Sequence, residues 1–182
     1  MLNQNNKKIE QAILLIKKSD FAKAIGLLEE IINHNSEDFR AYYLLGTLYL
    51  QLKKTDLAEL NLRNALKLNN NMTEAMHNLG IIFILKKNLI EAKDYFSKAL
   101  QINPENLQTL IELGRTYELL CNFEEAKKTF EKVLKIDPDN PVASSLLANI
   151  LLKNGFHSEG LKYLKKSSGL IKFQNENFTI VK

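Results

Sequence analysis

The fold is decided by residues 73–106, which read TEAMHNLGIIFILKKNLIEAKDYFSKALQINPEN. Apolar and small residues recur at the i, i+3, i+4, i+7 spacing of an amphipathic helix, once in each half of this stretch. Asn88 stands just before the second half, and Pro104 follows it. Proline lacks an N–H and clashes with the turn behind it, so it ends a helix. The stretch therefore predicts two helices joined by a short turn.

The same pattern recurs along the chain with a period of 34 residues. Small residues keep this period at Gly46, Gly80 and Gly114, and at Ala24, Ala58, Ala92 and Ala126. Large apolar residues keep it at Leu45, Leu79, Leu113 and Leu147, and at Leu28, Leu62, Phe96, Phe130 and Leu164. Because these independent series agree in phase, the chain is predicted to form five helical hairpins, at residues 5–38, 39–72, 73–106, 107–140 and 141–168.

Helix ends and helix contacts are predicted by the same register. Asx side chains precede the first helix of a hairpin at Asp38, Asn106 and Asn140, and the second helix at Asp20, Asn88 and Asn122. Each can accept a hydrogen bond from a free N–H of the first turn. Small residues such as Gly80 and Ala92 let two helices approach closely, so enlarging them should overpack the hairpin.

This pattern resembles the tetratricopeptide repeat, a helix-turn-helix unit of 34 residues. The best match is the hairpin at 73–106, which carries Met76, Leu79, Gly80, Phe83, Ala92, Phe96, Ala99 and Pro104 at the family's positions. The end repeats depart from the pattern, for example at Lys8 and Gln11 and at Ser144 and Gly160. Departures at both ends are typical of capping repeats. The resemblance implies an all-α fold, a right-handed α-solenoid over residues 1–168.

For such arrays the resemblance also implies a concave groove lined by the first helices, which binds an extended peptide or a helix. The residues it places in the groove are Arg40, Tyr43, Thr47, Glu74, His77, Asn78, Ile81, Gln108, Ile111, Glu112, Arg115, Glu118 and Asn149. The alternative is that several of them simply pack against neighbouring helices. One subclass grips a peptide carboxylate with Lys, Asn and Arg at fixed positions, and Glu112 stands where that pattern needs a cation. Carboxylate gripping of that kind is therefore disfavoured.

The amino-acid composition and net charge limit the classes of function that the protein can have. The 182 residues are 45% apolar and 25% charged, with a net charge of +4 that is spread along the chain. This small excess implies no nucleic-acid partner. The single Cys121 cannot form an intramolecular disulfide, and no run approaches the roughly 18 apolar residues of a membrane span. We therefore expect a soluble cytoplasmic protein without a membrane partner.

No pattern of catalytic residues stands out. His34, His77 and His157 occupy unrelated positions in the repeat, so they are not expected to converge on a metal. Cys121 has no histidine at an equivalent position, which disfavours a nucleophile. We therefore expect a non-catalytic interaction module without a cofactor. Two alternatives stay open: the recruiting part of a larger enzyme, such as a glycosyltransferase or methyltransferase, and self-association through the end repeats or the tail.

The tail, residues 169–182, departs from the repeat. Two short β-rich runs, 170–173 and 178–181, flank a polar turn, which predicts a small β-hairpin. Because an isolated two-stranded hairpin is scarcely stable in water, it is expected to cover the last helix near Leu161 and Leu164. The alternative is that the tail begins a further domain.

Overall fold

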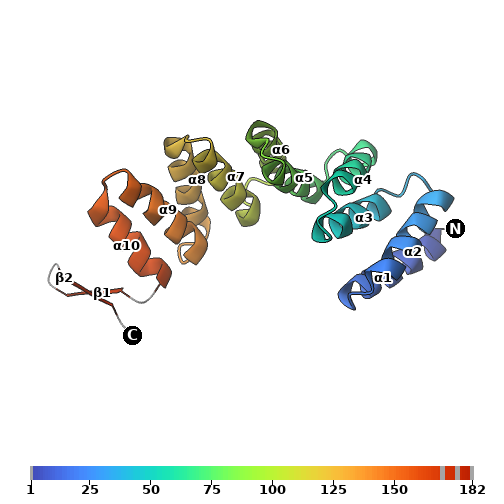
Figure 1. Ribbon diagram of the computed structural model, residues 1–182, viewed down its shortest axis with the longest axis horizontal. Coiled ribbons are helices and arrows are strands. Elements are labelled where there is room, and N and C mark those ends of the chain that lie inside the picture. The colour runs from blue at the N-terminus through green and yellow to red at the C-terminus, as the bar shows by residue number, and fades with distance from the viewer. Residues whose placement is uncertain (1, 169–170, 175–176, 181–182) are drawn as a thin grey trace. The chain divides into compact units, whose positions relative to one another are not determined.

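The computed structural model describes residues 2–168, 171–174 and 177–180. In these residues the chain forms ten helices and two short strands (Figure 1). The helices are α1 (Leu2–Lys17), α2 (Phe21–His34), α3 (Phe39–Gln51), α4 (Thr55–Leu68), α5 (Thr73–Leu85), α6 (Leu89–Ile102), α7 (Leu107–Leu119), α8 (Phe123–Ile136), α9 (Pro141–Lys153) and α10 (His157–Ser168). Successive pairs pack as five antiparallel hairpins, as the 34-residue period predicts. The all-α, repeat-built fold is therefore confirmed.

The chain divides into two compact units, Met1–Ile102 and Asn103–Lys182. The first unit holds the hairpins α1–α2, α3–α4 and α5–α6, and the second holds α7–α8 and α9–α10. Within each unit the second helix of one hairpin packs against the first helix of the next. Each unit is thus a stack of hairpins whose core runs between the paired helices.

Most of the predicted helix caps are confirmed. Before the first helices, Asp38 accepts from the Arg40 N–H at 3.1 Å, and Asn106 and Asn140 accept in the same way at 2.9 and 3.0 Å. Before the second helices the caps are longer, 3.5 Å at Asp20 and 3.4 Å at Asn88.

At Asn122 the cap prediction is wrong, because the side chain makes no capping hydrogen bond. The ψ angle is 69° at Asn122 and 66° at Asp20, whereas it is between 91° and 111° at Asp38, Asn106 and Asn140. Asp20 still caps its helix at this smaller ψ, at 3.5 Å, so the smaller ψ goes with the longer caps and does not by itself account for the missing cap at Asn122.

The turns inside the hairpins share one backbone conformation. The residue at the turn has positive φ in every hairpin: 59° at Ser19 and Lys53, 60° at Lys87 and Cys121, and 83° at Gly155. The N–H of the next residue then bonds to the carbonyl five residues back, as Asn88 does to Phe83 at 2.8 Å. This closure satisfies the free carbonyls at the end of the first helix. Positive φ favours glycine, and Gly155 is the only glycine among these five turn positions.

The close approach within a hairpin occurs where the small residues predict it. A Cβ added at Gly80 would lie 2.5 Å from Cε1 of Phe96, and one at Gly114 equally close to Cε1 of Phe130. Both phenylalanines are fully buried, as is Ala92. These glycines therefore provide the space that a buried aromatic ring on the second helix fills, and the packing prediction is confirmed.

The tail contains strands β1 (Ile171–Gln174) and β2 (Asn177–Ile180), paired antiparallel with Ile171 opposite Ile180. The predicted hairpin is therefore present, with each run displaced by one residue toward the turn. The predicted cover over Leu161 and Leu164 involves tail side chains that lie outside those described, so it stays a prediction. The division between array and tail at residue 168 also stays a prediction.

Candidate binding surfaces on the first helices

The residues assigned to the groove lie on helices α3, α5, α7 and α9, and all of them are at least partly accessible. In the first unit they are Arg40, Tyr43, Thr47, Glu74, His77, Asn78 and Ile81; in the second they are Gln108, Ile111, Glu112, Arg115, Glu118 and Asn149. We call each set the first-helix surface of its unit. Partial exposure is what a binding surface requires, and it leaves their predicted role as ligand contacts a prediction.

In the first unit, hydrogen bonds join neighbouring first helices across this surface. The Asn78 amide on α5 donates to the Thr47 hydroxyl on α3 at 3.2 Å. The Arg40 Nη1 on α3 donates to the Asn6 Oδ1 on α1 at 2.7 Å. Tyr43 and Ile81 are half-buried on the same two helices, α3 and α5. The surface therefore has a fixed polar framework with accessible aromatic and aliphatic side chains.

Arg40 is held by the fold. Its Nε and Nη2 donate to the two carboxylate oxygens of Asp38, at 2.9 and 2.7 Å. The Asp38 side chain is only 4% exposed, so its charge needs this partner. The Arg40 hydrogen bond lowers the pKa of Asp38, and the carboxylate raises that of Arg40. Arg40 thus combines a cap-stabilising role with a side chain that is 40% exposed.

His77 contributes to packing as well as to the surface. Its ring lies 5.5 Å from the ring of buried Phe96, tilted by 59°. Burial lowers the pKa of the imidazole below its usual 6.5. His77 is therefore uncharged near pH 7 and packs on Phe96 as a neutral ring.

In the second unit, the first helices are joined by a charge pair. The Lys153 ammonium on α9 lies 3.3 Å from the Glu118 carboxylate on α7. Gln108, Arg115 and Asn149 are exposed, while Ile111 is half-buried. Arg115 is therefore an accessible cation on the first-helix surface of this unit.

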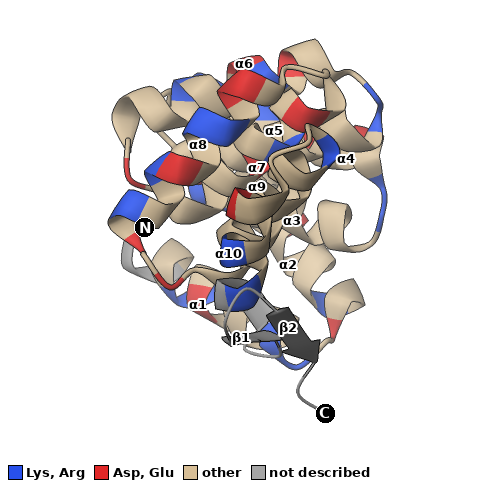
Figure 2. Ribbon diagram, turned by 90° about the vertical axis from the view of Figure 1, so that its left-hand side faces the viewer, with Lys and Arg blue, Asp and Glu red and all other residues tan. Residues whose placement is uncertain are grey.

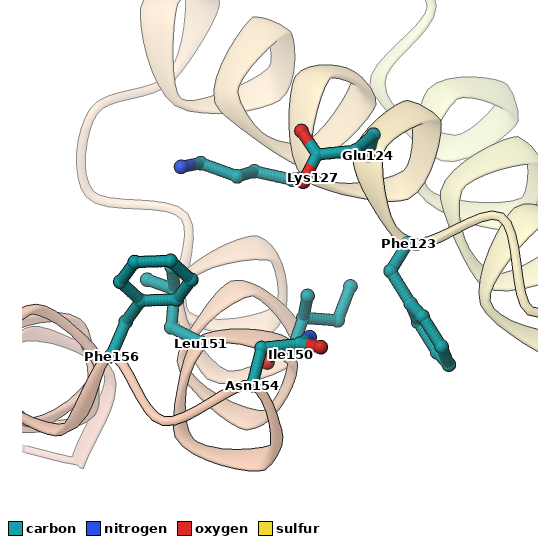
Figure 3. A pocket seen from close by; sticks show the side chains of 7 residues that line it. All are labelled: Phe123, Glu124, Lys127, Ile150, Leu151, Asn154 and Phe156. Atoms are coloured by element: carbon teal, nitrogen blue, oxygen red, sulfur yellow. Dashed lines mark hydrogen bonds between the residues drawn. The ribbon is translucent and has the colours of Figure 1, made fainter.

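Sequence reasoning missed a concave feature between α8 and the end of α9. Its residues are Phe123, Glu124, Lys127, Ile150, Leu151, Asn154 and Phe156, around a volume of about 190 Å³. We call it the α8–α9 cleft. Figure 3 shows the rings of Phe123 and Phe156 at opposite ends, with α9 side chains between them. One sequence signal was available: Phe156 stands where Asp20, Lys54, Asn88 and Asn122 stand in the other hairpins.

Charge is interspersed in both units. Figure 2 shows basic and acidic residues alternating over the helices rather than gathered by sign. Among the described residues, no three His, Cys, Asp or Glu side chains come together as a metal would require. In the same part of the chain, no helix combines the length and apolar character that crossing a bilayer demands.

Comparison with known families places the chain. Two family models, both described as Tetratricopeptide repeat, match residues 9–60 and residues 83–150 and 122–167. Together they match more than half of the sequence. The chain belongs to the tetratricopeptide repeat family, as the spacing of Gly80, Ala92 and their equivalents indicates. No curated protein sequence matches it.

Solved structures agree with this assignment. A crystal structure of MamA has a TM-score of 0.81 and 22% identity, covering 86% of this chain and 91% of that one. A structure of pilF from Pseudomonas aeruginosa has a TM-score of 0.82 and 20% identity, covering 94% and 78%. YrrB, described as a tetratricopeptide repeat protein with an unusual peptide-binding site, has a TM-score of 0.76 and 19% identity, covering 88% and 82%. At these identities the likeness establishes the fold.

Proposed function

We propose that this protein is a non-catalytic interaction module that binds a peptide segment or a helix of a partner protein on its first-helix surfaces. The observation that carries the proposal is the Asn78–Thr47 hydrogen bond beside Tyr43 and Ile81. It fixes two helices relative to each other while leaving apolar side chains accessible. Binding to a surface that is already ordered loses little conformational entropy. The peptide-binding description of YrrB supports the same use of the fold.

The first-helix surfaces offer complementary contacts. Tyr43 supplies an aromatic ring with a hydroxyl, and such side chains are frequent anchors at interfaces. Asn78 keeps one amide hydrogen and its carbonyl oxygen for a peptide backbone after bonding Thr47. Arg115 supplies an exposed cation in the second unit. In the first unit, a segment with apolar side chains and free backbone amides fits the contacts that Tyr43 and Asn78 offer.

Two single variants test the proposal. A partner is captured with the wild-type protein, its bound segment is mapped, and the affinity of that segment is measured by titration calorimetry for Tyr43→Ala and Arg115→Ala. The substitution in the unit that contacts the mapped segment is expected to weaken binding about tenfold or more, because it removes a contact without touching the hairpin core.

The matched controls are Lys67→Ala and Lys132→Ala, two exposed second-helix lysines on α4 and α8. They change charge or size to a similar degree away from the first-helix surfaces. Equal loss of affinity in the controls and in the test variants would show that the ligand binds elsewhere.

A further inference from the structure

We propose that the α8–α9 cleft binds one large apolar side chain of an acidic peptide segment, next to a carboxylate of that segment. The cleft belongs to the second unit and lies between α8 and the end of α9. It shares no residue with the first-helix surface of that unit. The inference goes beyond the proposed function, because it adds a second binding site of different chemistry.

The floor and ends of the cleft are apolar. Ile150 and Leu151 are buried, at 3% and 1% exposure, and form its floor. Phe123 and Phe156, at its two ends, are 36% and 57% exposed. A volume of about 150 Å³ accommodates benzene in a protein interior, so about 190 Å³ accommodates one phenyl or isobutyl group.

Phe156 is not explained by the stability of its own helix. It immediately precedes α10, at the position where Asp20 and Asn88 cap the second helices of their hairpins. A phenylalanine cannot accept a hydrogen bond there, and apolar residues are poor N-caps. The chain thus exposes an aromatic ring where the repeat otherwise carries a polar side chain. A ring that contacts a ligand explains that exchange.

The charge next to the ring selects the ligand. The Lys127 ammonium lies 5.8 Å from the centre of the Phe156 ring and extends over that end of the cleft (Figure 3). Its nearest carboxylate, Glu131, is 4.0 Å away, at the limit of an ion pair. Glu124 also lines the cleft, in the first turn of α8, so a carboxylate of the ligand must approach from the Phe156 end, where the Lys127 ammonium lies. Lys127 can therefore pair with a carboxylate of the ligand while its stem covers the apolar side chain.

Asn154 is the remaining polar residue of the cleft, and in its side chain only the amide nitrogen has a partner among the described residues. The Asn154 amide donates to the carbonyl of Ile150 at 2.8 Å, which leaves its side-chain oxygen as an acceptor. This oxygen suits a backbone N–H of an extended peptide. The three contacts define a short recognition element: a large apolar residue, a neighbouring acid and one free backbone amide.

The test is NMR titration of the ¹⁵N-labelled full chain with two probes, Ac-Asp-Phe-Asp-NH₂ and Ac-Lys-Phe-Lys-NH₂. The acidic probe should shift the amide signals of Lys127, Asn154 and Phe156 with a dissociation constant on the order of 10 mM, which is what burial of one apolar side chain supports. The basic probe should bind about two- to fivefold more weakly, the usual effect of one accessible ion pair. In the Lys127→Glu variant, the basic probe should bind more tightly than the acidic probe.

Phe156→Asn separates binding from stability. It removes the ring and restores the residue of Asn88, so the melting temperature should be unchanged or higher while affinity for the acidic probe falls at least tenfold. Retained affinity in this variant would overturn the proposal, as would equal binding of the two probes or an absence of shifts at the cleft. A concentration-dependent dimer in light scattering that Phe156→Asn abolishes would also overturn it, because the occupant would be a second copy. Tyr43→Ala should leave the titration unchanged, so failure here is distinct from failure of the first-helix surfaces.

Discussion

Both units pack one hairpin against the next, but side chains fill the junction between hairpins more completely in the first unit than in the second. In the first unit, Arg63 of α4 lies over the rings of Phe83 and Tyr95, with its guanidinium carbon 5.6 and 5.8 Å from their centres. It also donates to the Tyr95 hydroxyl at 3.0 Å and to Glu59 at 2.7 Å. One cation thus fills the junction between two consecutive hairpins.

The second unit leaves the corresponding junction open. Lys127 of α8 lies over only one ring, that of Phe156, and next to it is the α8–α9 cleft. The buried Ser144 hydroxyl on α9 has no hydrogen-bond partner among the described residues. The hairpin pattern is therefore enough to form the fold, whereas the side chains between hairpins decide whether a junction is closed or leaves space for a ligand.

The largest effect is expected where the units are alike. Gly80→Ala and Gly114→Ala each place a Cβ 2.5 Å from a fully buried phenylalanine ring. Each should lower the free energy of unfolding by about 2 kcal/mol in urea titration, despite the better helix propensity of alanine. A clear difference between the two would show that the units do not share this packing.

Gly46→Ala tests the same packing against an aliphatic residue, because its Cβ would lie 2.7 Å from Cγ of fully buried Leu62 and 3.1 Å from the Leu62 backbone nitrogen. The backbone nitrogen cannot rotate away, so the cost should also be about 2 kcal/mol. In the same hairpin as Gly80, Ala92→Leu should cost about 1 to 3 kcal/mol by overpacking. If Ala92→Leu melted like the wild type, the buried position of Ala92 would be contradicted.

The next prediction compares the stability that one cation contributes to the junction between hairpins in each unit. Arg63→Ala should cost about 1 kcal/mol, because it removes two ring contacts and two hydrogen bonds from a partly exposed site. Lys127→Ala should cost less than about 0.5 kcal/mol, since it removes one ring contact at an open junction. Thermal melts compare the two. Equal costs would mean that the second junction is as tightly closed as the first.

A gain in stability is expected in the second unit. Ser144→Ala removes a buried hydroxyl that lacks a partner and improves helix propensity, so it should raise the free energy of unfolding by about 0.5 to 1 kcal/mol. The control is Ser145→Ala at the half-buried neighbouring position, which should change the free energy of unfolding less than Ser144→Ala does. A loss of stability in Ser144→Ala would indicate that the hydroxyl has a partner after all.

The smallest effect is a pH dependence in the first unit. Burial lowers the folded pKa of His77 below 6.5, so the unfolded chain binds a proton more readily. The free energy of unfolding is therefore highest, with respect to His77, above pH 6.5. It decreases as the pH falls from there through the folded pKa of His77. His77→Gln should flatten the dependence of the melting temperature on pH between 7 and 5. An unchanged slope in this variant would assign the dependence to other groups.

Much of the fold could be predicted because helix spacing, caps and small residues are local patterns. The 34-residue period located every hairpin, and Gly80 with Phe96 indicated the close contact within one. The short turns were predicted but their backbone conformation was not, because Lys53 and Cys121 adopt positive φ without being glycine. In those turns the backbone hydrogen bonds of the closing turn outweigh the cost of the conformation.

The candidate sites were less predictable, because they depend on pairs of residues distant in sequence. The resemblance placed Arg40 and His77 on an accessible helix face, but it could not show that Asp38 holds Arg40 or that Phe96 packs on His77. The α8–α9 cleft combines the start of α8 with the turn after α9. Only the polar-to-aromatic change at Phe156 pointed to it in the sequence.

The most direct test of the proposed function is the affinity of a mapped partner segment for wild type, Tyr43→Ala, Arg115→Ala and the two lysine controls, measured by titration calorimetry under one set of conditions. The account predicts about tenfold or greater weakening in at least one first-helix variant and wild-type affinity in both controls. Wild-type affinity in Tyr43→Ala and in Arg115→Ala alike would contradict it.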